Sequence, residues 1–96
     1  MQLNYPARIA FALVGLGLVA GEVVTWVAAV SSWGERSFVF QSLFFAFCIA
    51  HFAIGALWLV EAGTGDSLTG KHLLIQVAIT ALSIAVLWVM ICELHR

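Results

Sequence analysis

Charged residues are scarce in this sequence, and they form no cluster of either sign. Lys and Arg number four and Asp and Glu number five, so charged residues make up 9% of the 96 residues, against about 25% in ordinary soluble domains. The basic residues are scattered and the formal net charge is -1. This distribution excludes the basic patch that nucleic-acid binding requires.

Cysteine is also rare, and Cys48 and Cys92 are the only two. The first lies near the middle of one hydrophobic stretch and the second at the end of the next, a difference in depth of roughly 14 Å at the helical rise. A disulfide joins Cα atoms less than about 7 Å apart. We therefore expect no disulfide between them.

Long hydrophobic runs are what the sequence does contain. Hydrophobic residues make up 64% of the chain, and residues 9–30, 38–60 and 73–92 include only one charged residue, Glu22. Each run reaches about 30 Å as a helix, the thickness of the hydrocarbon core of a bilayer. The sequence predicts an all-α integral membrane protein, a single membrane domain over residues 1–96. Its transmembrane helices are expected near residues 9–30, 38–60 and 73–93.

The first hydrophobic run exceeds the 7–15 residues or so of a signal-peptide core, so we expect it to be retained as a span. The connections after it are short, about seven and about twelve residues, which makes successive helices antiparallel neighbours. They leave no room for a catalytic domain outside the membrane, so a non-catalytic subunit is favoured over an enzyme. Arg8 and Lys71 lie on one side and Arg36 and Arg96 on the other, so the positive-inside rule gives no orientation.

The second connection matches the glycine and lysine positions of a phosphate-binding loop between Gly65 and Lys71. That motif requires Ser or Thr after the lysine and a strand before the loop. Here His72 follows the lysine, and a hydrophobic helix precedes the loop. We therefore expect no nucleotide site, and we interpret the segment as a polar turn in which Ser67 or Thr69 caps the third helix.

Small and ionisable residues interrupt the first predicted helix. Gly17 and Gly21 form a G-x-x-x-G pair, which allows another helix to approach closely, from this chain or from a partner. The carboxyl of Glu22 lies at a depth where an ionisable group costs on the order of 2–3 kcal/mol. We expect it to be neutral, paired or directed into a protein interior, where it handles protons, recognises a partner or bonds to a neighbouring helix. Its helix face also carries Gly15, Thr25 and Ala29.

His51 lies close to the middle of the second predicted span. Steps of 100° place it on the same third of the helix as Gln41, Phe44, Cys48, Gly55 and Trp58. An unpaired imidazole is costly in lipid, so we expect a cofactor, a proton path or a polar neighbour as its partner. On the third predicted helix Gln76, Thr80 and Ser83 share a stripe, which predicts a seam of interhelical hydrogen bonds.

The order of residues around this histidine is also informative. His51 is followed four residues later by Gly55, then by Glu61 just past the span, by a polar turn that ends at Lys71, and by a third apolar helix. Over about residues 43–90 this order resembles the membrane-anchor subunits of the succinate dehydrogenase and fumarate reductase family, in which such a histidine ligates heme. A weaker likeness is to the three-span subunit IV of heme-copper oxidases.

The resemblance implies a non-catalytic membrane-anchor subunit of a respiratory electron-transfer complex, in a bacterial inner membrane or an equivalent energy-transducing membrane. It implies a b-type heme with His51 as one axial ligand of the iron and with space for the macrocycle edge at Gly55. Arg8 would lie near the heme propionates or a quinone. The second axial histidine would come from a partner subunit or a second copy, because His72 and His95 lie roughly 10 Å or more from the depth of His51.

Two alternatives need no heme. One is a structural accessory subunit that holds a larger membrane complex together through the glycine pair and aromatic contacts. The other is a small homo-oligomeric channel, transporter or holin-like pore, in which Glu22, Gln41 and the third-helix seam line a polar path. Three thin helices carry more polar groups than they can shelter from lipid, so we expect the chain to work with other membrane chains.

Overall fold

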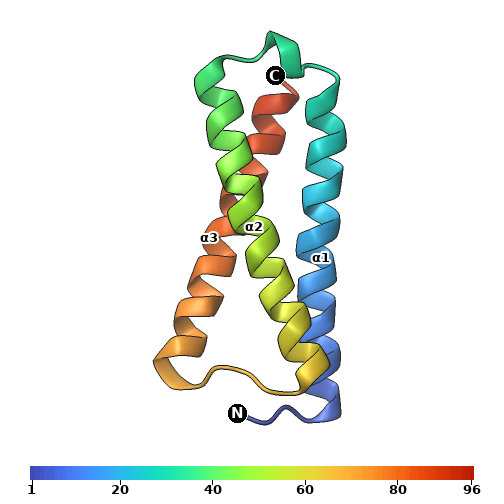
Figure 1. The fold of residues 1–96 in the computed structure, drawn as a ribbon, viewed down its shortest axis with the longest axis vertical. Coiled ribbons are helices and arrows are strands. Elements are labelled where there is room, and N and C mark those ends of the chain that lie inside the picture. The colour runs from blue at the N-terminus through green and yellow to red at the C-terminus, as the bar shows by residue number, and fades with distance from the viewer.

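The computed structural model describes all 96 residues and contains three long antiparallel helices, α1 (Tyr5–Val30), α2 (Phe38–Thr64) and α3 (Gly70–Leu94). A short 3-10 helix, η1 (Trp33–Glu35), lies in the first connection. The helices form an elongated bundle of 47 × 22 × 17 Å, with the N-terminus at one end and the C-terminus at the other (Figure 1). The predicted all-α architecture with three antiparallel helices is confirmed.

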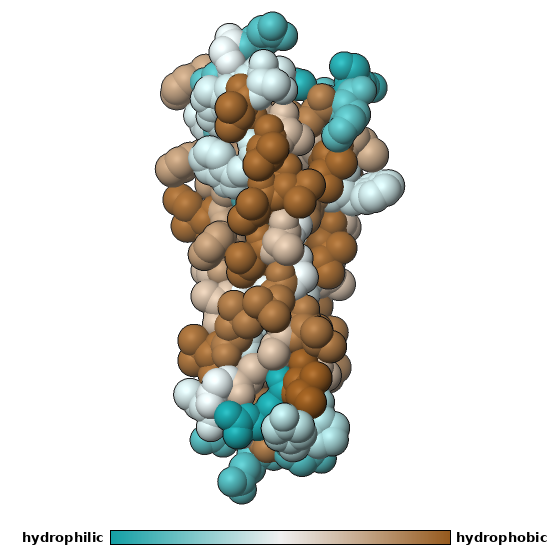
Figure 2. Space-filling view, turned by 90° about the vertical axis from the view of Figure 1, so that its right-hand side faces the viewer, coloured by the Kyte–Doolittle hydropathy of each residue, from teal (hydrophilic) through white to brown (hydrophobic).

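All three helices are long and apolar enough to cross a membrane. Their 26, 27 and 25 residues extend about 38–40 Å, which exceeds the hydrocarbon thickness of about 30 Å. Figure 2 shows an apolar band across the middle of the molecule and hydrophilic residues gathered at both ends. The chain is an integral membrane protein.

The helices extend three or four residues beyond the predicted spans at three of their ends. The reason is that hydrophobicity marks the part inside the membrane, whereas capping residues decide where a helix stops. The side chain of Asn4 accepts a 2.9 Å hydrogen bond from the N–H of Ala7 and so begins α1. Gly65 ends α2 in the left-handed conformation, with φ of 77°. Thr69 is the N-cap of α3, but its side chain makes no capping hydrogen bond.

Helices α1 and α2 approach each other closely where Gly15 faces Gly55. A Cβ atom added to Gly15 would lie 2.7 Å from Cγ of Leu59 and 3.0 Å from the carbonyl oxygen of Gly55. A Cβ atom added to Gly55 would lie 3.2 Å from a methyl of Val19 and 3.3 Å from Cβ of Leu18. This contact therefore depends on the absence of side chains at both glycines.

The predicted pair Gly17 and Gly21 does not form such a contact within the chain. Nothing lies within 4 Å of a Cβ atom added to Gly17, and a Cβ atom at Gly21 would meet only a terminal methyl of Leu87 on α3, at 3.1 Å. The spacing of the pair shows which residues share a helix face. It does not show which part of that face a neighbouring helix covers.

An arginine closes each end of the bundle by binding the C-terminus of a helix. Arg8 donates two hydrogen bonds of 2.8 Å to the last turn of α2, at the carbonyl oxygens of Ala62 and Gly63. Arg36 donates two longer ones, of 3.3 and 3.4 Å, to the last carbonyl oxygens of α3. These carbonyls have no partner within their helix, and a cation at this end also interacts favourably with the helix dipole.

Candidate functional site

A column of buried polar side chains runs along the inside of the bundle. Its members are Glu22 and Thr25 of α1, His51 and Glu61 of α2, and Gln76, Thr80 and Ser83 of α3. Apart from Gln41, the buried faces coincide with the stripes predicted for each helix, because residues three or four apart in the sequence share the face that meets the neighbouring helices.

Side-chain hydrogen bonds join α2 to α3 at three levels of this column. The pairs are His51 with Ser83, Trp58 with Thr80, and Glu61 with Gln76. The predicted seam on α3 is thereby confirmed. Each such bond contributes only about 0.6 kcal/mol on average in a membrane protein, so the seam stabilises the arrangement of α2 and α3 without implying chemistry.

Glu61 is a member of the column that the sequence alone did not identify. Its position after the predicted span led to its interpretation as an acidic residue beyond the membrane, yet it is 5% exposed. Its carboxylate accepts hydrogen bonds from Gln76 and from the N–H of Leu68, the latter at 3.2 Å. The burial of Glu61 could have been predicted from the helix periodicity, since Glu61 follows Trp58 by three residues on the same helix face.

His51 is fully buried between all three helices, and both of its ring nitrogens are bonded. Nε2 lies 3.0 Å from the carbonyl oxygen of Leu18 on α1, and Nδ1 is bonded to the hydroxyl of Ser83 on α3. A carbonyl oxygen only accepts, so Nε2 donates to it, and in the neutral ring Nδ1 then accepts from the hydroxyl. The polar neighbour that the sequence left open as a partner of His51 is thus present on both sides of the ring.

The surroundings of His51 do not fit a heme. Neither nitrogen is free to ligate iron without the loss of a hydrogen bond to Leu18 or Ser83. The space beside Gly55 that the macrocycle edge would need is filled by Leu18 and Val19, whose atoms would lie within 3.3 Å of an added Cβ.

Arg8 is also engaged elsewhere. Its guanidinium is held at the carbonyl oxygens of Ala62 and Gly63, eleven or twelve residues beyond His51, or roughly 16–18 Å along the helix axis. The three residues assigned to a heme by resemblance, His51, Gly55 and Arg8, therefore do not converge on one cavity.

Glu22 is the member of the column whose ionisable group has no partner. The residue is 1% exposed, and neither carboxyl oxygen forms a hydrogen bond. The carboxyl lies beside the thiol of Cys48 on α2, and the indole of Trp26 lies against the same thiol. Thr25 does not serve it, because its hydroxyl donates to the carbonyl oxygen of Gly21 at 2.7 Å. An ionised carboxylate in these surroundings would lack both water and a counter-charge.

Between Glu22 and the Arg36 end of the bundle, the interior is aromatic. Phe44 is completely buried and forms edge-to-face contacts with Trp26 and Trp33, with ring centroids 5.9 and 5.5 Å apart. Gln41 does not line the interior column, since its amide donates a 2.7 Å hydrogen bond to the carbonyl oxygen of Trp33 in the first connection. The polar column thus extends from the Arg8 end as far as Glu22 and Thr25, and apolar rings fill the remaining length.

Comparison with protein-family models, with curated proteins and with solved structures finds no match to this chain. The geometry of the polar column and of the lipid-facing surface is therefore what bears on its function.

Proposed function

We propose that this chain is a non-catalytic structural subunit of a larger membrane complex. The proposal rests on what the interior polar groups bind. His51, Trp58 and Glu61 of α2 each form a hydrogen bond with a residue of α3. These side chains fix the three helices relative to one another. A bundle held in this way presents a rigid surface to its surroundings.

The outward faces support a partner chain. Only 28%, 28% and 22% of the residues in the most hydrophobic windows of α1, α2 and α3 are buried, so about three quarters of each span faces lipid or another protein. Gly17 lies on one such face, in a groove between α1 and α3 that Leu13, Ile84 and Leu87 also line. A partner helix can approach closely at a glycine that nothing in its own chain covers.

The electron-transfer version of this proposal comes from the resemblance to anchor subunits of the succinate dehydrogenase type. It requires His51 to exchange the hydroxyl of Ser83 or the carbonyl of Leu18 for iron. The pore alternative requires Glu22 and the α3 seam to face a channel between copies, but these residues face the interior of a single copy. The structural role needs neither rearrangement.

Photo-crosslinking in the native membrane tests the proposal. A photoreactive residue at position 17 should give one discrete crosslinked species that contains a second membrane protein in fixed stoichiometry. Gly17→Leu should reduce recovery of that protein after extraction into nanodiscs. Gly63→Leu is the matched control, because nothing lies within 4 Å of an added Cβ at Gly63 either, and Gly63 lies at the end of α2, outside the groove.

A monodisperse monomer without associated subunits, unchanged by Gly17→Leu, would contradict the proposal. The absorption spectrum of the same preparation separates its two versions. A heme Soret band that disappears in His51→Ala supports an electron-transfer subunit, whereas a partner without a His51-dependent band supports the structural role.

A further inference from the structure

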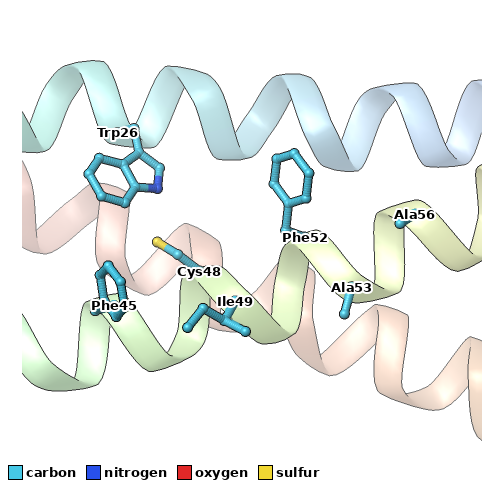
Figure 3. A pocket seen from close by; sticks show the side chains of 7 residues that line it. All are labelled: Trp26, Phe45, Cys48, Ile49, Phe52, Ala53 and Ala56. Carbon is cyan, nitrogen blue, oxygen red and sulfur yellow. The ribbon is translucent and has the colours of Figure 1, made fainter.

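An apolar groove opens between α1 and α2 toward the lipid, at the middle of the membrane. It has a volume of about 490 Å³ and is lined chiefly by Trp26 of α1 and by Phe45, Cys48, Ile49, Phe52 and Ala53 of α2. Figure 3 shows the indole of Trp26 opposite the thiol of Cys48, and Phe52 directed from α2 toward α1. The volume lies in the usual range of small-molecule sites, about 300–1,000 Å³.

The carboxyl of Glu22 lies behind the wall of this groove. It is adjacent to the Cys48 thiol, and Trp26, one turn further along α1, lines the groove itself. Both carboxyl oxygens are buried and unbonded. The adjacent thiol is only a weak donor, so the carboxyl still lacks a strong one, whereas buried polar groups in proteins are nearly always bonded.

We propose that this groove, the α1/α2 groove, binds a lipid-soluble organic amine, whose ammonium group donates hydrogen bonds to Glu22. The walls are entirely hydrophobic and face the hydrocarbon, so the ligand enters from the membrane and its body is apolar. Its head complements the carboxyl, since an ammonium supplies both the missing donors and the missing counter-charge. The rings of Trp26, Phe45 and Phe52 add the aromatic surfaces that attract organic cations.

No other charged group competes for this head. On α2 the nearest ionisable residues to Glu22 are Cys48 and His51, and the ring nitrogens of His51 are both bonded. From α3, the contact next to Glu22 is the apolar side chain of Leu87, which packs at Gly21. Cys48 lines the groove and its thiol lies beside the carboxyl, so the proposal requires this small side chain to rotate about χ1 for the ammonium to reach Glu22. This inference does not depend on the proposed structural role.

Two probes of the same shape test the proposal, 4-hexylbenzylamine and 4-hexylbenzyl alcohol. Calorimetry measures their binding to the whole chain in phosphatidylcholine nanodiscs, with empty nanodiscs as the blank for partition into lipid. The wild-type protein should bind the amine about 10- to 100-fold more tightly than the alcohol, as expected for a charge-assisted hydrogen bond. Glu22→Gln should abolish this difference and leave the affinity for the alcohol unchanged.

Two further variants assign the binding to the groove. Ala53→Phe fills the groove without contact to Glu22 and should remove the binding of both probes, while Gly17→Leu, in the groove between α1 and α3, should leave both affinities unchanged. If Glu22→Gln fails to fold, the amine-to-alcohol ratio and the Ala53→Phe variant still decide the outcome. Equal affinities for the two probes, or amine binding that survives in Ala53→Phe, would overturn the proposal. So would disulfide crosslinking between copies of Ala53→Cys, because a second chain would then occupy the groove.

Discussion

Gly15→Ala should destabilise this protein far more than Gly17→Ala, although the two glycines are neighbours on α1. A Cβ atom at position 15 would lie 2.7 Å from Cγ of Leu59 and 3.0 Å from the carbonyl oxygen of Gly55, whereas carbon atoms pack best at about 3.5–4.0 Å. Either Leu59 moves by about 1 Å or α1 and α2 separate. Overpacking of this kind costs about 1–3 kcal/mol in the free energy of unfolding.

Gly17→Ala is the matched control, because it carries the same gain in helix propensity, about 1 kcal/mol, with nothing within 4 Å of the added Cβ. The difference between the two variants therefore isolates the packing contribution. Reversible unfolding by SDS in mixed micelles, followed by circular dichroism, should give an unfolding free energy about 1–3 kcal/mol lower for Gly15→Ala than for Gly17→Ala. If Gly17→Ala is the more destabilised variant, the G-x-x-x-G pair forms the close contact and the helix register described above is refuted.

Three further predictions concern the polar groups. Glu22→Met should raise the free energy of unfolding by about 1–3 kcal/mol, because it removes a buried carboxyl without a partner. Glu61→Met should lower it by a similar amount, because it leaves the donors that bond to Glu61 unsatisfied. A destabilised Glu22→Met would show that this carboxyl does have a partner. A double-mutant cycle of His51→Ala and Ser83→Ala should give a coupling energy of about 0.6 kcal/mol, and at most about 1.7, with zero coupling as the refuting result. Arg36→Gln should accelerate amide hydrogen exchange in the last turn of α3, at a cost of about 0.3–1 kcal/mol, and unchanged exchange there would exclude the capping role.

The spans and their buried faces could be predicted from the sequence because each follows from one helix alone. A charge-free run of sufficient length identifies a span, and a 100° step places His51 on the same face as Gly55 and Trp58 before any neighbour is known. The stripe of Gln76, Thr80 and Ser83 was found in the same way, and all three are buried.

What lies across from each face could not be predicted, because it depends on the register between helices. Periodicity does not show that Leu18 and Ser83 flank the His51 ring, nor that Cys48 lies beside Glu22. It also does not distinguish Gly15, which α2 covers, from Gly17, which no residue covers. Heme ligation by His51 came from resemblance and stays a prediction, one that the two hydrogen bonds of the ring do not favour.

α1 and α2 are attached to each other differently from the way in which α3 is attached to both, and this difference affects the order in which the helices assemble in a bilayer. α1 and α2 meet backbone to backbone at Gly15 and Gly55, so the pair is a hairpin that can close as soon as it has been inserted. α3 joins this hairpin through side chains: three hydrogen bonds from α2, two from Arg36 and apolar contacts such as that of Leu87 at Gly21. The three bonds from α2 together contribute about 2 kcal/mol at the average value in membranes. Such bonds can be exchanged for equivalent bonds to another chain, whereas the glycine contact cannot. We accordingly expect α3 to dock last during biogenesis and to be the first helix that a partner displaces.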